Sequence, residues 1–185
     1  MNFTITRQNL HSGLAAVSAS IPSKTTLPVL SNILFEARED GVWMSGTDLD
    51  VAVRVKIQAD VKEAGSLTAP GKKLQEITRE LPDQPVEVAT HGDQIELRCG
   101  RSHFKLNGLP ADEFPNLPEI AFEEGWTIVG KNLHGLIHHT SFAVSTEESR
   151  PILNGVLWEL REGEMRMVAT NGHRLARMGV PAGSG

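Results

Sequence analysis

An internal repeat constrains the fold of this chain more than any other feature of its sequence. When the 185-residue sequence is shifted by 123 positions against itself, residues 3–54 align without a gap with residues 126–177 and share 15 identities in 52 positions. Unrelated sequences of average composition would share about three. Because a repeat of this quality requires one fold for both copies, the chain contains two related structural units.

Each copy of the repeat has the pattern of a short strand, a helix, a loop and a hairpin. The first copy begins with alternating residues that predict a strand, and Leu10, Leu14 and Val17 then recur at helical spacing. Residues 29–37 predict a buried strand, and a turn at residues 39–41 leads into another extended segment. The repeat is therefore predicted to be a β-α-β-β unit, which places the chain in the α+β class.

The first unit continues beyond the repeat. Residues 51–57 predict a further strand, and a second helix is expected to start at Pro70, a residue type favoured in the first helical turn, and to end near Leu81. The apolar alternation predicts three more strands, at residues 86–89, 95–99 and 102–106. The first domain is therefore expected to consist of two halves, each made of a helix and a sheet.

A proline-rich segment at residues 109–119 separates the two units. It contains three prolines and little periodicity, which is typical of a linker. We therefore expect a first domain at residues 1–120 and a second domain at residues 121–185 that begins near Phe122. By analogy with the first domain the second needs roughly another sixty residues, so we expect it to be truncated.

The charge balance narrows the possible functions. A net charge of −5 argues against a generic basic nucleic-acid binder, because phosphate attraction requires an excess of Lys and Arg, so any DNA contact must be local. The sequence has no apolar run near the roughly eighteen residues of a membrane span and no secretion signal at its N-terminus, which favours a cytoplasmic protein. Cys99, the single cysteine, is expected in the core.

Five motifs resemble, in order and spacing, those of the bacterial DNA polymerase III beta sliding clamp. They are LPVLSNILFE, GTDLDVAVR, GRSHFKLNGLPADEFPNLPE, RPILNGVLWE and VATNGHRLA. The resemblance covers essentially the whole chain. It implies the DNA-clamp fold, with helices on one face of antiparallel sheets, and a non-catalytic processivity factor of the replicative DNA polymerase. Such a clamp is a head-to-tail homodimeric ring of three-domain subunits that slides on duplex DNA; this chain would lack the third domain.

The second predicted helix offers a candidate DNA surface. Its apolar stripe leaves Lys72, Gln75 and Arg79 on one polar face, beside two glutamates that weaken the positive field. An ordinary solvated face has the same pattern, but a clamp must encircle DNA without gripping it, so a weak cationic lining suits the family. The resemblance also implies a basic residue near DNA in the first loop. The expected DNA-binding residues are Lys24, Lys72, Lys73 and Arg79.

The resemblance also implies a docking pocket on the second domain. Family clamps bind short peptides of polymerases, the clamp loader and repair proteins between their second and third domains. Apolar side chains would form the wall for leucine or phenylalanine anchors, and an arginine would orient them. Without the resemblance, the Asn171-Gly172 step would indicate only a turn. The matching residues are Leu153, Thr170, Gly172, His173, Arg174 and Leu175.

Subunit contact is expected at one edge of the first domain, which family clamps pair with the third domain of the other subunit. The matching residues are Ile77, Leu81, Phe104 and Leu106. The same four residues also fit the core of the first domain, because an interface edge and a core edge have the same apolar pattern. The sequence leaves both interpretations open.

Two groups of residues suggest metal chemistry. His134 and His138 lie four apart on a predicted helix, and Asp48 and Asp50 are expected on one strand face, the arrangement of a possible magnesium site. The sequence has no HExxH motif and none of the usual hydrolase, nucleotide or dinucleotide motifs, so we expect no enzyme, cofactor or metal. The alternatives are a metal-dependent hydrolase that uses Asp48, Asp50 and a histidine, or a peptide-binding repeat scaffold that does not encircle DNA.

Overall fold

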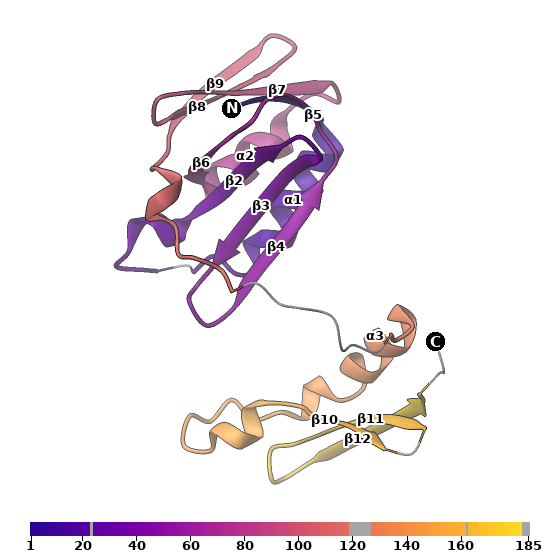
Figure 1. The fold of residues 1–185 in the computed structure, drawn as a ribbon. Helices are drawn as coiled ribbons and strands as arrows, with labels where there is room; N and C mark the ends of the chain where they lie inside the picture. Colours follow the sequence, from indigo (N-terminus) through magenta and orange to yellow (C-terminus); the bar gives the residue numbers. More distant parts are fainter. Residues whose placement is uncertain (23, 119–126, 162, 183–185) are drawn as a thin grey trace. The chain divides into compact units, whose positions relative to one another are not determined.

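The computed structural model divides the chain into two compact units, Met1–Pro118 and Glu119–Gly185 (Figure 1). The structure describes residues 1–22, 24–118, 127–161 and 163–182. Phe122, the expected start of the second domain, lies outside these described residues.

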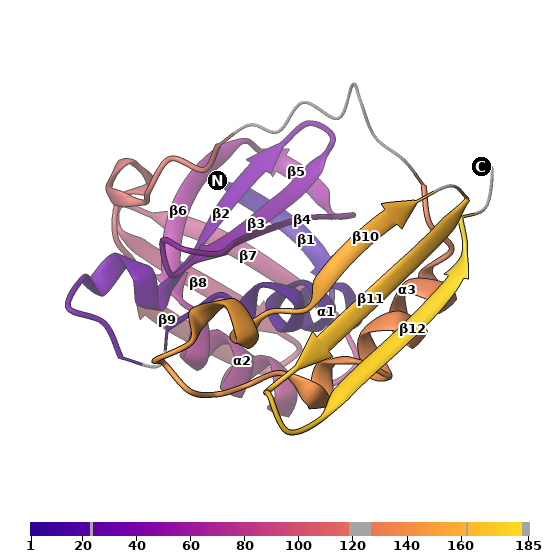
Figure 2. The same ribbon diagram turned by 90° about the horizontal axis from the view of Figure 1, so that it is seen from below.

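The described residues of unit 1 form two antiparallel sheets, two α-helices and two short 3₁₀ helices. In chain order the elements are β1 (Asn2–Thr6), α1 (Arg7–Ser18), η1 (Pro28–Ser31), β2 (Asn32–Arg38), β3 (Gly41–Thr47), β4 (Ala52–Ile57), β5 (Asp60–Glu63), β6 (Gly65–Pro70), α2 (Gly71–Glu80), β7 (Pro85–His91), β8 (Gln94–Cys99), β9 (Ser102–Asn107) and η2 (Ala111–Glu113). One sheet has the order β4-β3-β2-β6 and the other the order β5-β1-β7-β8-β9. Helices α1 and α2 lie side by side against the sheets (Figures 1 and 2).

Helix α1 forms where the sequence predicts it. Thr6 caps its N-terminus by accepting a hydrogen bond from the backbone N–H of Asn9 at 3.1 Å. The three residues at helical spacing, Leu10, Leu14 and Val17, are fully buried against the sheets, as predicted. Cys99 is also buried in this core, which confirms the expectation for the single cysteine.

Strands β5 and β6 were not predicted, and the start of the second helix was wrong by one residue. Pro70 ends β6 and precedes the helix, which begins at Gly71. The pairing of β6 with β2, from Asn32 opposite Pro70 to Ala37 opposite Gly65, is long-range. The small and polar residues of β6 have low β-propensity, so the strand forms because it pairs with β2.

Unit 2 reproduces the repeat with fewer elements. It contains α3 (Gly130–His138), η3 (Ser141–Ala143), η4 (Pro151–Asn154), β10 (Leu157–Arg161), β11 (Glu164–Thr170) and β12 (Leu175–Pro181). The sheet order is β10-β11-β12 and its pairs are antiparallel, so the predicted α+β class holds in both units. The bounds of η4 and β11 coincide with those of η1 and β3 after the shift of 123 positions.

The two units differ at one sheet edge. In unit 1 the strand β2 pairs with β3 on one side and with β6 on the other. Its repeat partner β10 pairs with β11, and within the described residues of unit 2 it has no strand on its other side. The buried core of unit 2 is accordingly small and is centred on Leu136, Met165 and Met167.

The described part of the chain contains no helix that combines the length and the apolar character required to cross a membrane.

Candidate functional site

Helix α2 presents its basic residues to solvent. Lys72, Lys73 and Arg79 are exposed, whereas Leu74 and Thr78 are buried. The predicted apolar stripe is confirmed, because Leu74 and Leu81 are buried and half-buried Ile77 packs against the same core; Thr78 is buried beside them. Burial of this threonine is tolerated because its hydroxyl donates a 2.7 Å hydrogen bond to the carbonyl of Leu74 one turn earlier.

Two further contacts modify the predicted polar face of α2. The side-chain amide of Gln75 donates to the carbonyl of Leu14 at 3.3 Å, so this residue is turned toward α1. Lys73 pairs with Glu76 at 3.1 Å, but both side chains are largely exposed and such pairs contribute little free energy. Lys72 and Arg79 are consequently the cations of α2 that no carboxylate pairs within the described residues.

Arg7, at the start of α1, adds a cation that sequence reasoning missed. Its guanidinium donates to the carbonyls of Thr78 and Arg79 at 3.2 and 2.8 Å, and thereby caps the C-terminus of α2. The two partners are more than 70 positions away in sequence, so no local motif could indicate the contact. The capping contact places one more positive charge beside the exposed end of α2.

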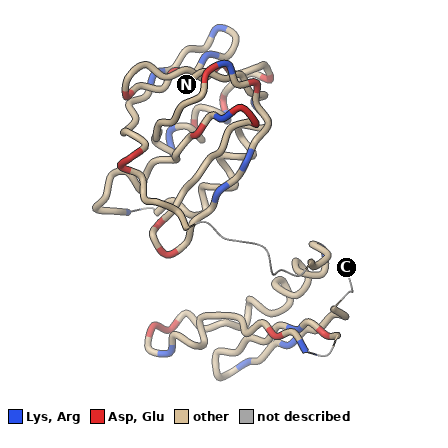
Figure 3. The backbone as a smooth tube through the Cα atoms, viewed as in Figure 1, with Lys and Arg blue, Asp and Glu red and all other residues tan. Residues whose placement is uncertain are grey.

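The helices carry positive charge in an acidic chain. Together α1, α2 and α3 contain five basic and two acidic side chains, whereas the whole chain has a net charge of −5. Elsewhere acidic and basic residues are both scattered over the strands and turns (Figure 3). The helices therefore carry a small local excess of positive charge, which agrees with the sequence argument that any DNA contact must be local.

Lys24 lies in the loop between α1 and η1, on a different element from the other three predicted DNA-binding residues. It lines a cavity of about 520 Å³ with Thr25, Leu27, Asp48 and Leu49. The structure thus brings Lys72, Lys73 and Arg79 together on one helix and places Lys24 at the loop that faces the β3–β4 turn.

The predicted partner-binding residues of unit 2 are centred on a tight turn between β11 and β12. The hydroxyl of Thr170 donates to the carbonyl of Arg174 at 2.7 Å and accepts from the N–H of Gly172 at 3.1 Å. The side-chain oxygen of Asn171 accepts from the N–H groups of His173 and Arg174, both at 3.0 Å. Gly172 has φ +90°, a conformation that favours glycine.

The same turn recurs in unit 1 with different residues. Thr47 bonds the carbonyl of Val51 at 2.9 Å and the N–H of Leu49 at 3.0 Å, and Leu49 has φ +82°. The carboxylate of Asp48 accepts from the N–H groups of Asp50 and Val51 at 3.0 and 2.7 Å. The expectation that Asp48 and Asp50 share a strand face was therefore wrong, because both lie in this turn and Asp48 holds its backbone.

An apolar cavity of about 500 Å³ lies beside the unit 2 turn. Of the six predicted wall residues, Leu153 and Thr170 line the cavity, whereas Gly172, His173, Arg174 and Leu175 form the exposed turn and the start of β12. Sequence reasoning missed most of the apolar lining: Pro151, Ile152, Val156, Leu157 and Val168. The repeat was the signal that could have found this lining, because Leu157 is the counterpart of Leu34. In unit 2 the strand that the repeat predicts to be buried leaves Leu157 exposed.

Arg174 is also close to an aromatic ring on the neighbouring 3₁₀ helix. Its guanidinium carbon lies 5.9 Å from the ring centroid of Phe142, whose side chain is 59% exposed. Leu175 is 67% exposed and Ile152 is 88% exposed. Unit 2 therefore presents a set of large apolar side chains next to a positioned cation, an arrangement typical of a peptide-binding surface.

The histidines of α3 do not converge on one point. The rings of His134 and His138 are stacked with centroids 5.9 Å apart, and His139 packs edge-on against His138. No group of three or more His, Cys, Asp or Glu side chains with metal-binding geometry occurs among the residues that the structure describes.

The predicted subunit edge divides into buried and half-buried residues. Leu81 is 5% exposed and belongs to the unit 1 core. Ile77, Phe104 and Leu106 are half-buried and pack against that core from its margin. Strand β9, which carries Phe104 and Leu106, is the last strand of its sheet, so these two residues lie at a sheet edge.

Glu96 concentrates charge next to this edge. The residue is 6% exposed, and its carboxylate contacts Lys105 at 2.6 Å, His103 at 3.2 Å and Arg98 at 3.3 Å. The hydrogen bond from Lys105, followed by that from His103, lowers the pKa of Glu96 from its ordinary 4.5 to about 2, against the opposing effect of burial. Glu96 therefore stays ionised and fixes basic side chains along β9.

Comparison with known proteins places both units in one family. The family pattern of the DNA polymerase III beta subunit, N-terminal domain, matches residues 1–118, and that of the central domain of the same subunit matches residues 127–184. The beta sliding clamp of Vibrio cholerae is 40% identical over 179 residues, and that of Bacillus subtilis is 36% identical over 185 residues. These alignments cover 95% of this chain and 49% of each relative.

Solved structures agree with the sequence comparison. The DNA polymerase III subunit beta of Pseudomonas aeruginosa has a TM-score of 0.89 at 38% identity, and the polymerase sliding clamp of Bacillus subtilis has a TM-score of 0.90 at 35% identity. Each likeness covers 98% of this chain and 50% of the other, so the chain spans about half the length of the relatives it matches. The predicted clamp fold is confirmed, and the chain belongs to the DNA polymerase III beta subunit family.

Proposed function

We propose that this chain forms part of a ring that encircles duplex DNA and tethers the replicative polymerase in the cytoplasm, a binding role without catalysis. Membership of the beta subunit family supports the role. The observation that carries it is the charge of α2, which exposes three cations against two carboxylates in an acidic chain. Topology would retain the ring on DNA, so a weak lining permits sliding.

Salt dependence tests the DNA-facing role of α2 in this chain. Each phosphate contact contributes a slope of about −0.9 to the dependence of log K on log salt. Replacing Lys72, Lys73 and Arg79 by alanine should therefore flatten the slope for a short duplex by about three. The matched control replaces Lys62 of β5 and Arg98 of β8, two exposed sheet cations, and should leave the slope unchanged. Equal flattening of the slope by both variants would contradict the assignment of DNA contacts to α2.

Encirclement requires a ring-forming protein. A hybrid in which residues 1–118 replace the N-terminal domain of the Pseudomonas aeruginosa subunit provides one, since the two share 38% identity. Loaded on nicked circular DNA, the hybrid should remain bound until the circle is linearised and should then slide off. Equal retention on both DNA forms would show binding without encirclement and would favour the peptide-binding scaffold.

We propose the apolar cavity of unit 2 and its adjoining turn as a docking surface for short partner peptides of polymerases, the clamp loader and repair proteins. The lining of Leu153 and its neighbours suits a leucine or phenylalanine anchor, and Arg174 can donate hydrogen bonds at the rim. Exposed Leu175 extends the apolar surface. The size of about 500 Å³ accommodates two such side chains.

Leu175→Ala tests this surface. In a hybrid whose first two domains carry this chain's residues, the change should weaken binding of a peptide with adjacent leucine and phenylalanine anchors by about 1 kcal/mol or more. Leu160→Ala is the matched control, because Leu160 is 53% exposed on β10 and does not line the cavity. Unchanged affinity for Leu175→Ala, or an equal loss for the control, would contradict the assignment.

We propose that Ile77, Leu81, Phe104 and Leu106 mark the subunit contact, with the half-buried residues of β9 at its surface and Leu81 supporting them from the core. The exposed sheet edge and the cations held by Glu96 support this location. Phe104→Glu should convert a dimeric hybrid to monomers in analytical ultracentrifugation without unfolding it. Persistence of the dimer would contradict the proposal.

A further inference from the structure

Helix α3 of unit 2 and the residue that follows it expose three histidines: His134, His138 and His139. The helix itself contains one lysine and no acidic residue. The rings of His134 and His138 are stacked, with centroids 5.9 Å apart and planes 9° from parallel, and the ring of His139 meets that of His138 edge-on at 5.2 Å. Histidine is the side chain whose charge ordinarily changes between about pH 5 and 8. The charge of this surface therefore depends on pH.

The elements packed against α3 turn apolar side chains toward it. These elements are β11, β12 and η3, and α3 lies on one face of their sheet (Figures 1 and 2). Met165 and Met167 of β11 form a core with Leu136 of α3, and Met178 of β12 packs against the same core. Because successive side chains of a strand alternate between the two faces, the charged residues of both strands lie on the face away from α3. They are Glu164, Arg166 and Arg177.

No carboxylate in the described part of the chain holds these histidines. The one histidine that forms an ion pair there is His103, with Glu96 in unit 1. The 3₁₀ helix η3 contains no charged residue, and the ring of its Phe142 is close to the guanidinium of Arg174. The surroundings described for α3 therefore offer no anion to the histidines, which are open to an anion from solution.

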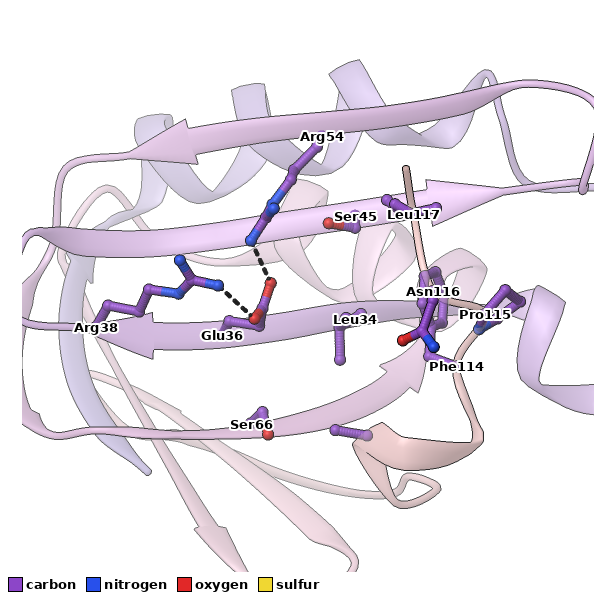
Figure 4. Close-up of a pocket in the computed structure, with 11 residues that line it drawn as sticks. Leu34, Glu36, Arg38, Ser45, Arg54, Ser66, Phe114, Pro115, Asn116 and Leu117 are labelled. Atoms are coloured by element: carbon purple, nitrogen blue, oxygen red, sulfur yellow. Dashed lines mark hydrogen bonds and ion pairs between the residues drawn. The ribbon is translucent and has the colours of Figure 1, made fainter. Parts of the chain in front are cut away.

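The arginines on the outer sheet face of unit 1 show the contrasting arrangement. Arg38 and Arg54 each contact one oxygen of Glu36 at 2.8 Å (Figure 4). An arginine keeps its charge at every pH at which the protein is folded, so such pairs do not respond to pH. The histidines of α3 differ from these arginines both in having a charge that changes with pH and in lacking a carboxylate partner among the described residues.

The repeat shows that the histidine cluster is particular to unit 2. The matching positions of α1 are His11, Ala15 and Ala16, so unit 1 has the first histidine without its two neighbours. Unit 1 has permanent cations instead, since Lys72 and Arg79 are exposed on α2. Helix α2 has no counterpart among the described residues of unit 2. The two units therefore present different kinds of basic group on their helices.

We propose that His134 and His138, assisted by His139, bind the phosphates of duplex DNA in their protonated form, so that DNA binding by unit 2 takes up protons. This inference rests on the proposed function, in which the helices meet DNA. Each protonated ring can donate a charge-assisted hydrogen bond to a phosphate oxygen. Two charged rings side by side repel each other, and a phosphate placed against both offsets this repulsion. The affinity of the chain for duplex DNA should therefore rise as the pH falls.

The test is the affinity of the whole chain for a short DNA duplex, measured by fluorescence anisotropy at pH 8 and pH 6. If one phosphate contact is gained at pH 6, the affinity at about 0.1 M salt should rise about tenfold, and the slope of log K against log salt should steepen by about one. Replacing all three histidines of the cluster by glutamine keeps polar side chains but removes the titration, and should reduce the rise to about twofold. The matched control for single changes compares His134→Gln with His91→Gln, an exposed histidine of β7, which should leave the rise unchanged.

His134→Lys makes the charge at this position permanent, so it should raise the affinity at pH 8 and narrow the difference between the two pH values. Unchanged amide resonances of β11 establish that each variant is folded. Equal rises in the parent chain and in the triple glutamine variant, or no rise between pH 8 and pH 6, would overturn the proposal.

The salt slope at pH 8 distinguishes this failure from failure of the proposed function. If removal of the α2 cations Lys72, Lys73 and Arg79 flattens that slope but no pH effect is seen, proton uptake is refuted and the DNA-facing role of α2 stands. Absence of duplex binding at both pH values would refute both proposals.

Discussion

Gly13 of α1 lies close to the sheet. Replacing it by alanine therefore has two opposing effects on the stability of unit 1, a gain in helix propensity and a loss from overpacking. A Cβ at this position would clash with Cδ1 of Ile57 and lie 2.9 Å from Sδ of Met44. Alanine favours the helix by about 1 kcal/mol relative to glycine. Overpacking a filled core costs about 1–3 kcal/mol.

Packing should win at this site. Met44 is fully buried and Ile57 is 8% exposed, so neither side chain can move into solvent. Taking the upper half of the overpacking range and subtracting the helix gain, Gly13→Ala should destabilise unit 1 by about 1–2 kcal/mol. Urea unfolding followed by the amide resonances of β3 reports this unit separately from unit 2.

A double-mutant cycle isolates the clash. Ile57→Val removes the terminal methyl group and alone costs about 1 kcal/mol, but in combination with Gly13→Ala the two changes should couple favourably by at least about 1 kcal/mol. Gly130→Ala in α3, where a Cβ meets nothing within 4 Å, is the control and should not destabilise unit 2. A stabilising Gly13→Ala, or additivity with Ile57→Val, would refute the packing argument.

Further predictions concern charge and the repeated turn. The pKa of Glu96 is lowered in the fold, so its stabilisation is complete above pH 4.5 and is lost as the pH falls toward 2; Glu96→Gln should flatten this acid limb of the stability curve, and an unchanged limb would contradict the pairing. Asn171→Ala removes the acceptor of two backbone N–H groups and should cost about 1 kcal/mol locally, seen as faster amide exchange at His173 and Arg174. Asp48→Ala should do the same in unit 1, and protection retained in both variants would show that the turn does not depend on these side chains.

The repeat allowed much of the fold to be predicted, because one pattern of strands and helix applies to both units. The helix face of Leu10, Leu14 and Val17 and the hairpin of β2 and β3 follow from local periodicity. Strand β6 could not be predicted from its own residues, since Gly65 and its small neighbours acquire strand structure from pairing with β2. Local sequence patterns therefore do not predict strands that depend on long-range pairing.

The candidate sites were less predictable than the fold. Exposure of Lys72 and Arg79 followed from helical spacing, whereas the cap that Arg7 forms on α2 depends on tertiary contact. Apolar residues such as Leu157 indicate a buried strand, because sequence cannot show that one side of β10 lacks a neighbour in the described unit. Asp48 was misassigned for a local reason, as an Asx turn and a strand end have similar patterns.

The repeated turn separates the side chains that hold its backbone from those that face solvent. Its hydrogen bonds use the side chains of only two positions, a threonine and an Asp or Asn, in both units. The next three positions differ completely, with Leu49, Asp50 and Val51 replaced by a glycine, a histidine and an arginine. Substitutions at the three outward positions therefore change the exposed surface of the turn, while the hydrogen-bonded scaffold that orients them stays constant.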